Sequence, residues 1–109
     1  MALKLFLDSA ELRVWQKWNK LGIFHGITTN PTLLNKAGWA SNQETLEKIT
    51  NQVDFLGYKS IHLQAWGKTT KEIIECAEKI FSIETKITKI FIKIPITKSG
   101  TEAAMHLIK

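Results

Sequence analysis

The feature that most constrains the fold is an alternation, repeated four times, of a short apolar run with a longer stretch of helical periodicity. Apolar residues at every second position are typical of strands, whereas apolar residues spaced i, i+3, i+4 are typical of amphipathic helices. The apolar runs span residues 3–8, 26–30, 60–66 and 89–96. The sequence therefore predicts four βα units, an α/β arrangement in which the strands are parallel.

Capping signals predict where the helices begin and end. Ser9 suits the start of the first helix, Gly22 suits its end, and Pro31 suits the first turn of a short second helix. The pattern Ser/Thr-x-x-Glu predicts three further helix starts, at Ser41, Thr69 and Ser99. No linker or change in composition divides residues 1–109, so we expect one domain.

The spacing of polar residues near the strand ends indicates which α/β fold this is. Asp8, Asn30, Gln64 and Lys93 recur about every 28 residues, close to the ~31 residues per unit of a (β/α)8 barrel of roughly 250 residues. The chain holds four of the eight units that such a TIM barrel needs. We therefore expect a half barrel.

Side-chain alternation predicts the direction in which these polar groups point. Each predicted strand has one apolar side that can pack under helices and a second side that carries a polar group near its C-terminal end. This second side holds Asp8, Thr28, Asn30, Gln64 and Lys93. Enzymes with this architecture keep their chemistry at the C-terminal ends of the strands, so we expect a polar barrel mouth.

Lys93 carries the most information because Ile92 and Ile94 flank it. Desolvation lowers the pKa of a lysine and gives a neutral amine that can attack a carbonyl group. A nearby Asp8 would raise that pKa, and the sequence does not decide which effect is larger. In the alternative interpretation, Lys93 is structural, at an exposed strand end or in a buried ion pair with Asp8.

The other candidates are polar side chains with two possible roles each. Asp8 could be a general acid/base or could cap the helix that follows it. Asn30 could bind substrate hydroxyl groups or brace its own turn. Thr28 and Gln64 could position a water molecule or a sugar hydroxyl.

Metal and nucleotide sites have no motif in this sequence. His25, His62 and His106 show no i, i+4 pairing and no cysteine partner, and there is no glycine-rich phosphate loop. We expect His62 to be a hydrogen-bonded core histidine rather than a ligand. We expect neither a metal nor another cofactor.

Charge and cysteine usage restrict the partners and the compartment. The net charge of +5 comes from lysines scattered over polar helix faces, which favours a solvated surface over a nucleic-acid site. The single Cys76 cannot form an internal disulfide, and the first apolar run is too short and too charged to span a membrane. We expect a soluble cytoplasmic protein with no nucleic-acid or membrane partner.

Three motifs in order carry a family resemblance. They are Leu5-Phe6-Leu7-Asp8-Ser9-Ala10-Glu11, Gly26-Ile27-Thr28-Thr29-Asn30-Pro31-Thr32, and Ile92-Lys93-Ile94-Pro95-Ile96-Thr97 with Gly100. These motifs resemble the successive strand ends of the transaldolase family, and they are most similar to its small members, which include fructose-6-phosphate aldolases. The resemblance covers the whole chain and identifies it as the N-terminal half of one (β/α)8 barrel domain.

The resemblance implies Schiff-base aldol chemistry without a cofactor. Lys93 would form the imine with a ketose phosphate such as fructose 6-phosphate, and Asp8 would handle proton transfer. Thr28 and Asn30 would contact the donor sugar. Cleavage would release an aldehyde phosphate and leave a dihydroxyacetone enamine, which a transaldolase passes to another aldehyde and an aldolase releases. The implied setting is carbohydrate metabolism.

Gln64 bears on the choice between those two activities. By the resemblance, Gln64 matches a position where transaldolases usually have Glu and the fructose-6-phosphate aldolases have Gln. This residue therefore favours an aldolase. A neutral amide can hold a catalytic water but cannot take its proton.

Length leads to a further expectation. Family members are about twice this length, as a (β/α)8 barrel of roughly 250 residues requires, and the later loops that often hold a substrate phosphate are missing. We expect these 109 residues to be a fragment, or half of a split or paired barrel, and inactive alone. The full-length protein would resemble homo-oligomeric relatives. The remaining alternative is a small basic α/β interaction or nucleic-acid-binding module in which Lys93 is structural.

Overall fold

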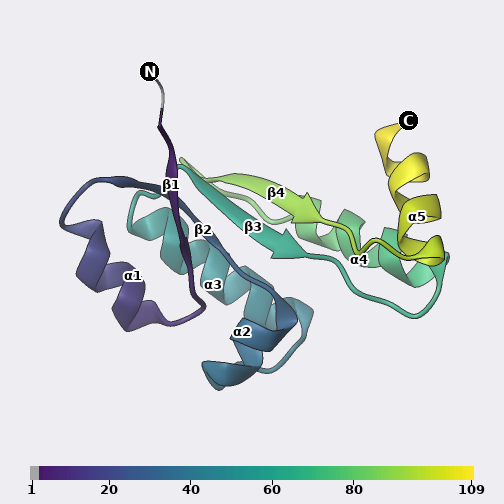
Figure 1. The fold of residues 1–109 in the computed structure, drawn as a ribbon, viewed down its shortest axis with the longest axis horizontal. Helices are drawn as coiled ribbons and strands as arrows, with labels where there is room; N and C mark the ends of the chain where they lie inside the picture. Colours follow the sequence, from purple (N-terminus) through teal and green to yellow (C-terminus); the bar gives the residue numbers. More distant parts are fainter. Residues whose placement is uncertain (1–2) are drawn as a thin grey trace.

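A computed structural model describes residues 3–109 and shows one four-stranded sheet. Its strands are β1 (Leu5–Asp8), β2 (Phe24–Thr28), β3 (Ser60–Gln64) and β4 (Lys89–Lys93), in the spatial order β1-β2-β3-β4 (Figure 1). The helices are α1 (Leu12–Asn19), α2 (Pro31–Lys36), α3 (Gln43–Phe55), α4 (Thr70–Phe81) and α5 (Lys98–Ile108). All three strand pairs are parallel. The prediction of four βα units is confirmed.

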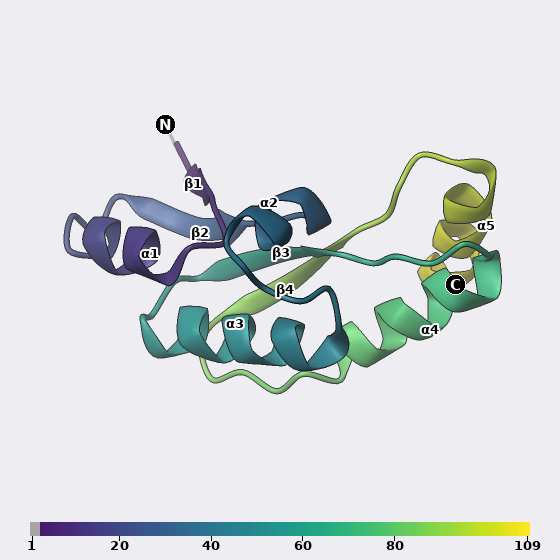
Figure 2. The same ribbon diagram turned by 90° about the horizontal axis from the view of Figure 1, so that it is seen from below.

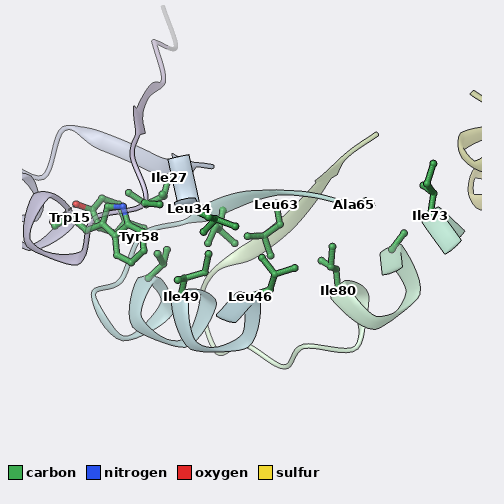
Figure 3. Close-up of a cluster of buried hydrophobic side chains, with 14 of the residues drawn as sticks. Trp15, Ile27, Leu34, Leu46, Ile49, Tyr58, Leu63, Ala65, Ile73 and Ile80 are labelled. Carbon is green, nitrogen blue, oxygen red and sulfur yellow. Dashed lines mark hydrogen bonds between the residues drawn. The ribbon is translucent and has the colours of Figure 1, made fainter. Parts of the chain in front are cut away.

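The core lies between the sheet and the helices that cover one of its faces. Helices α3 and α4 run along this face (Figure 2), and Ile61 and Leu63 of β3 point at them without exposure to solvent. The helical spacing of three apolar residues predicts one buried face on α3, and this prediction is confirmed, because all three are at most 1% exposed: Leu46, Ile49 and Val53. Figure 3 shows strand and helix side chains meeting in this layer. Each such burial stabilises the fold by about 1.5–3 kcal/mol.

The i, i+3, i+4 spacing of apolar residues predicts that Leu21 and Phe81 lie on buried helix faces, but both are exposed. Leu21 lies beyond the end of α1, which ends at Asn19, and Phe81 is the last residue of α4. The side chain of Phe81 is 60% exposed because it reaches the outer side of β4, the last strand of the sheet. Within residues 3–109 the sheet has no strand beyond β4 that would cover it.

Two of the predicted helix starts are confirmed. Pro31 occupies the first turn of α2, and the Asn30 side-chain oxygen accepts the Leu33 N–H at 2.9 Å. Thr69 caps α4, because its Oγ1 accepts the Glu72 N–H at 3.2 Å. Each bond satisfies one of the free N–H groups at a helix start.

The start predicted at Ser9 is wrong because the sheet holds this residue. The Ser9 N–H donates to the Thr28 carbonyl at 3.1 Å, which prolongs the pairing of β1 with β2. The chain is free to turn only afterwards, so α1 begins at Leu12, and its N-cap residue, Glu11, makes no side-chain capping bond.

The starts predicted at Ser41 and Ser99 are also displaced. Asn42 caps α3 by accepting the Thr45 N–H at 2.8 Å, and Thr97 caps α5 by accepting the Gly100 N–H at 3.0 Å. Asn, Ser and Thr are all good N-cap residues, so a capping pattern alone does not select among neighbouring candidates.

Among residues 3–109, no helix is long and apolar enough to cross a membrane.

Asp54 at the end of α3 fixes the segment that leads into β4. Its carboxylate accepts three backbone N–H groups: those of Ile87 and Thr88 on Oδ1, at 2.8 and 2.9 Å, and that of Lys86 on Oδ2, at 2.8 Å. Burial alone raises the pKa of Asp54, but these bonds lower it more, so the pKa lies below its ordinary value of 3.8. The ionised carboxylate therefore stabilises the approach to the strand that carries Lys93.

We predict that Asp54→Asn lowers the free energy of unfolding by about 1–2 kcal/mol at pH 7. This is the low end of the range for hydrogen bonds to a charged group, because Asp54 is partly exposed. The folded-state pKa of Asp54 lies below the unfolded one, so its contribution is present above the ordinary value of 3.8 and is lost as the pH falls through the folded value. Urea unfolding at pH 7 and pH 3 should show the difference between wild type and variant shrinking in acid. Glu47→Gln, an exposed change on the same helix, is the control; equal losses in both variants would contradict the prediction.

Candidate active site

The predicted site residues form two cross-strand pairs at the C-terminal ends of the strands. Asp8 of β1 is the register partner of Thr28 of β2, and Gln64 of β3 is the partner of Lys93 of β4. His62 of β3, the partner of Thr28, links the two pairs. Neighbouring strands lie about 4.7–4.9 Å apart, so register partners are neighbours on one face of the sheet. The parallel sheet thus brings four of the five candidates to one edge.

Asp8 lies exposed at this edge and is oriented by its neighbour. The Thr28 hydroxyl donates to Asp8 Oδ1 at 2.7 Å, a short bond typical of a charged acceptor. The alternative role of Asp8 as a helix cap is wrong, because α1 begins at Leu12 and has no side-chain capping bond. Asp8 therefore has one oxygen held in place while the side chain can still exchange protons with solvent.

Lys93 is half-buried at the end of β4. Burial lowers its pKa below the ordinary value of 10.5, and the negative charge of Asp8 opposes that shift without cancelling it. Among residues 3–109, no carboxylate forms an ion pair with Lys93. Lys93 thus stands at a strand end but is half-buried rather than exposed, and the buried ion pair with Asp8 does not form. A lysine with a lowered pKa holds a larger fraction of neutral, nucleophilic amine.

Asn30 and Gln64 occupy different kinds of position. The side-chain oxygen of Asn30 caps α2, so the residue braces its turn, which was one of its two expected roles. Gln64 is half-buried beside Lys93 in the β3–β4 register. Its neutral amide can both donate and accept hydrogen bonds next to the amine.

A layer of rings beneath the polar groups was missed by the sequence reasoning. The His62 ring lies between those of Phe6 and Phe91, with centroid distances of 5.4 and 4.8 Å. The Phe6 ring reaches His62 across β2, where Gly26 has no side chain in the way. The sequence contained a signal for this layer. Each ring residue stands two positions before a polar candidate and therefore lies on the same face of its strand: Phe6 before Asp8, His62 before Gln64 and Phe91 before Lys93.

The expectation that His62 is a hydrogen-bonded core histidine is wrong. The residue is half-buried on the uncovered face of the sheet, and its Nδ1 has no hydrogen-bond partner within residues 3–109. Burial lowers the pKa of His62, and the positive charges of Lys93 and His25 lower it further. The imidazole is therefore neutral at pH 7 and adds no positive charge beside Lys93.

Residues 3–109 contain no group of three His, Cys, Asp or Glu side chains placed to hold a metal ion. The chemistry that this edge can supply comes from an amine, a carboxylate, hydroxyl groups and amides.

Comparison with known proteins identifies the family of this chain. Residues 5–109 match the family described as Transaldolase/Fructose-6-phosphate aldolase. The chain belongs to this family. The family has the TIM-barrel fold, so the four parallel βα units of this chain are about half of a (β/α)8 barrel, as the sequence predicted.

Individual relatives agree with this assignment. A probable transaldolase 2 of Bacillus anthracis is 33% identical over 105 residues, which cover 96% of this chain and 47% of the relative. Probable transaldolases of Clostridium kluyveri and Methanococcus maripaludis are 35% and 34% identical, and each alignment covers 96% of this chain and 45% of the relative. The chain spans about half the length of the curated relatives it matches.

We predict that the Lys93 amine titrates below 10.5 and that Asp8→Asn lowers its pKa further, because the variant removes the one negative charge that opposes desolvation. The measurement is a side-chain NMR titration of 15N-lysine protein, with the Lys93 signal assigned by its loss in Lys93→Met. Glu47→Gln, which removes a carboxylate on α3, is the matched control and should leave the Lys93 titration unchanged. A Lys93 pKa at or above 10.5, or one insensitive to Asp8→Asn, would contradict the assignment.

Proposed function

We propose that the protein containing this chain carries out Schiff-base (class I) aldol cleavage or transfer of a dihydroxyacetone unit from a ketose phosphate such as fructose 6-phosphate. In this proposal residues 1–109 form the N-terminal half of a single barrel domain. The observation that carries it is Lys93, a half-buried amine with a lowered pKa and no ion-pair partner among the described residues, at the C-terminal edge of the sheet. Membership of the transaldolase/fructose-6-phosphate aldolase family supports it.

The proposed chemistry begins with attack of the neutral Lys93 Nζ on the ketone carbon of the sugar. The adduct loses water to form an iminium ion, which withdraws electrons from the bond between the third and fourth carbons. As that bond breaks, the hydroxyl on the fourth carbon loses its proton and becomes the carbonyl of an aldehyde phosphate. The electron pair stays on the third carbon as an enamine attached to Lys93.

Proton transfer is the role we assign to Asp8. Its carboxylate is held by the Thr28 hydroxyl, remains exposed, and acts electrostatically on Lys93, which supports a role within reach of the reacting amine. A carboxylate in this position can accept the hydroxyl proton during cleavage and return a proton later.

The remaining candidates are assigned to substrate and water. Thr28 and the Asn30 amide would contact donor-sugar hydroxyls, and Gln64, beside Lys93, would hold a water molecule. The resemblance to the fructose-6-phosphate aldolases, which have Gln where transaldolases usually have Glu, favours the aldolase. The amide of Gln64 could hold that water but could not take its proton. The cytoplasmic location, the absence of a cofactor and the homo-oligomeric state of the full-length protein stay predictions. The alternative of a basic interaction or nucleic-acid-binding module has no supporting observation in residues 3–109.

We predict that residues 1–109, incubated with dihydroxyacetone and sodium borohydride at pH 7, acquire a reduced adduct on Lys93 before any other lysine, because burial favours the neutral amine there. Peptide mass spectrometry locates the adduct. Lys93→Met should remove it, whereas Lys89→Met, a change at an exposed lysine of the same strand, should leave it. Adducts spread evenly over the lysines, or an adduct pattern unchanged by Lys93→Met, would sink the proposal.

We also predict that residues 1–109 do not turn over fructose 6-phosphate. The loops that hold a substrate phosphate in barrels of this architecture follow the late strands, which the four units do not include. A coupled assay for the aldehyde phosphate measures this. Product release by residues 1–109 that is lost in Lys93→Met would contradict this prediction, because it would show that four βα units are sufficient for turnover.

A further inference from the structure

A β-bulge interrupts the pairing of β1 with β2 near the N-terminal ends of the two strands. Leu5 pairs with Phe24. The next residue of β1, Phe6, pairs with Gly26, which leaves His25 as an extra residue without a partner on β1. Bulges are rare in parallel pairs, and they re-aim side chains, often beside functional sites. The Phe6 ring meets the His25 ring edge-on at a centroid distance of 5.6 Å, so the re-aimed imidazole is also held from one side.

His25 lines a cavity of about 290 Å3 at the N-terminal ends of β1, β2 and β3. These ends lie together in the sheet (Figure 1), and the walls of the cavity come from the segments that lead into the three strands. Two of these segments turn at Gly22 and Gly57, whose φ values of 65° and 85° favour glycine. The three strands are consecutive neighbours, so the cavity forms within this part of the sheet, at the end opposite to Lys93.

The charged groups of this cavity are all basic. Lys4 and Lys59 line it together with His25, and the Lys59 N–H donates to the His25 carbonyl at 2.8 Å. Burial lowers the pKa of His25 below its ordinary value of 6.5, and the positive charges of Lys4 and Lys59 lower it further. Within residues 3–109, no acidic residue lines the cavity and neither lysine forms an ion pair. The gathered positive charges therefore repel one another, and an anion between them would relieve that repulsion.

The size and the charge of the cavity suit a phosphate group. Its volume lies just below the roughly 300–1,000 Å3 of typical small-molecule sites, which favours a small ligand. Two lysine ammonium groups match the charge of a dianion, and lysine is a common phosphate ligand. His25 is neutral at pH 7 when the cavity holds no anion, and it can take up a proton beside a bound anion and then donate from both ring nitrogens.

We propose that the N-terminal ends of β1, β2 and β3 form an anion site for a phosphate group, inorganic phosphate or a phosphate monoester, with Lys4, His25 and Lys59 as its ligands. Barrel enzymes keep their chemistry at the C-terminal ends of the strands, so a ligand at this opposite end takes no part in the reaction. It stabilises the folded protein by binding to it. The proposal does not rest on the proposed aldol chemistry.

The test follows the His25 imidazole by NMR in 13C-histidine-labelled protein that contains this chain. Inorganic phosphate is added, sodium chloride at the same ionic strength is the reference, and the His25 signal is assigned by its loss in His25→Asn. Phosphate should shift this signal along a saturable curve and raise the pKa of His25, because a bound anion favours the imidazolium form. An equal response to chloride would mean charge screening only and would overturn the proposal.

Charge-removing variants test the ligands. Lys4→Met and Lys59→Met should each weaken phosphate binding roughly 10-fold or more. Both lysines are exposed, so far-UV circular dichroism should show the fold retained. Lys20→Met is the matched control, because Lys20 is an exposed lysine at the end of α1 that does not line the cavity, and it should leave binding unchanged. Equal losses in all three variants would indicate diffuse surface charge and overturn the site.

A Lys93→Met background separates this site from the catalytic edge. The His25 response to phosphate should persist there, because Lys93 lies at the other end of its strand, and a lost response would overturn the proposal. In the same background, fructose 6-phosphate is the second probe. Tighter binding than that of inorganic phosphate would identify a phosphate monoester as the ligand, and equal or weaker binding would identify free phosphate. No saturable response to either probe up to about 10 mM would overturn the proposal.

Discussion

Parallel pairing of the four strands is the constraint on which the rest of this structure depends. Because every strand runs the same way, every helix must return the chain to the same end, and all C-terminal strand ends meet at one edge. Asp8 and Lys93, 85 positions apart in the sequence, come within electrostatic reach only through this arrangement.

The electrostatic balance at the edge follows from distance and burial. Lys93 loses water on folding, which disfavours its charged form, while Asp8 is near enough to oppose the shift but forms no ion pair with it. Asp8 instead accepts the Thr28 hydroxyl, and the neutral His62 adds no charge. An amine that is partly desolvated and unpaired remains available for reaction, whereas a direct ion pair would keep it protonated.

Much of the fold could be predicted from the sequence, because the spacing of apolar residues, every second position in strands and about every 3.6 in helices, is a local property. The four strands and the buried face around Ile49 follow from it, and the helix start at Thr69 follows from a capping pattern that is equally local. Helix starts that depend on nonlocal bonds could not be read in this way. Ser9 fails as a cap because Thr28, 19 residues later, holds its N–H in the sheet, and Phe81 is exposed because β4 is the last strand.

The sequence by itself determined which residue types stand at the strand ends, since alternation along a strand needs no knowledge of the neighbouring strands. Asp8, Thr28, Gln64 and Lys93 are all identifiable on that basis. Only the tertiary structure decided which of them are partners and that rings from three strands pack together beneath the site. Register, burial and charge separation arise between segments distant in sequence, so they are fixed when the sheet assembles and not before.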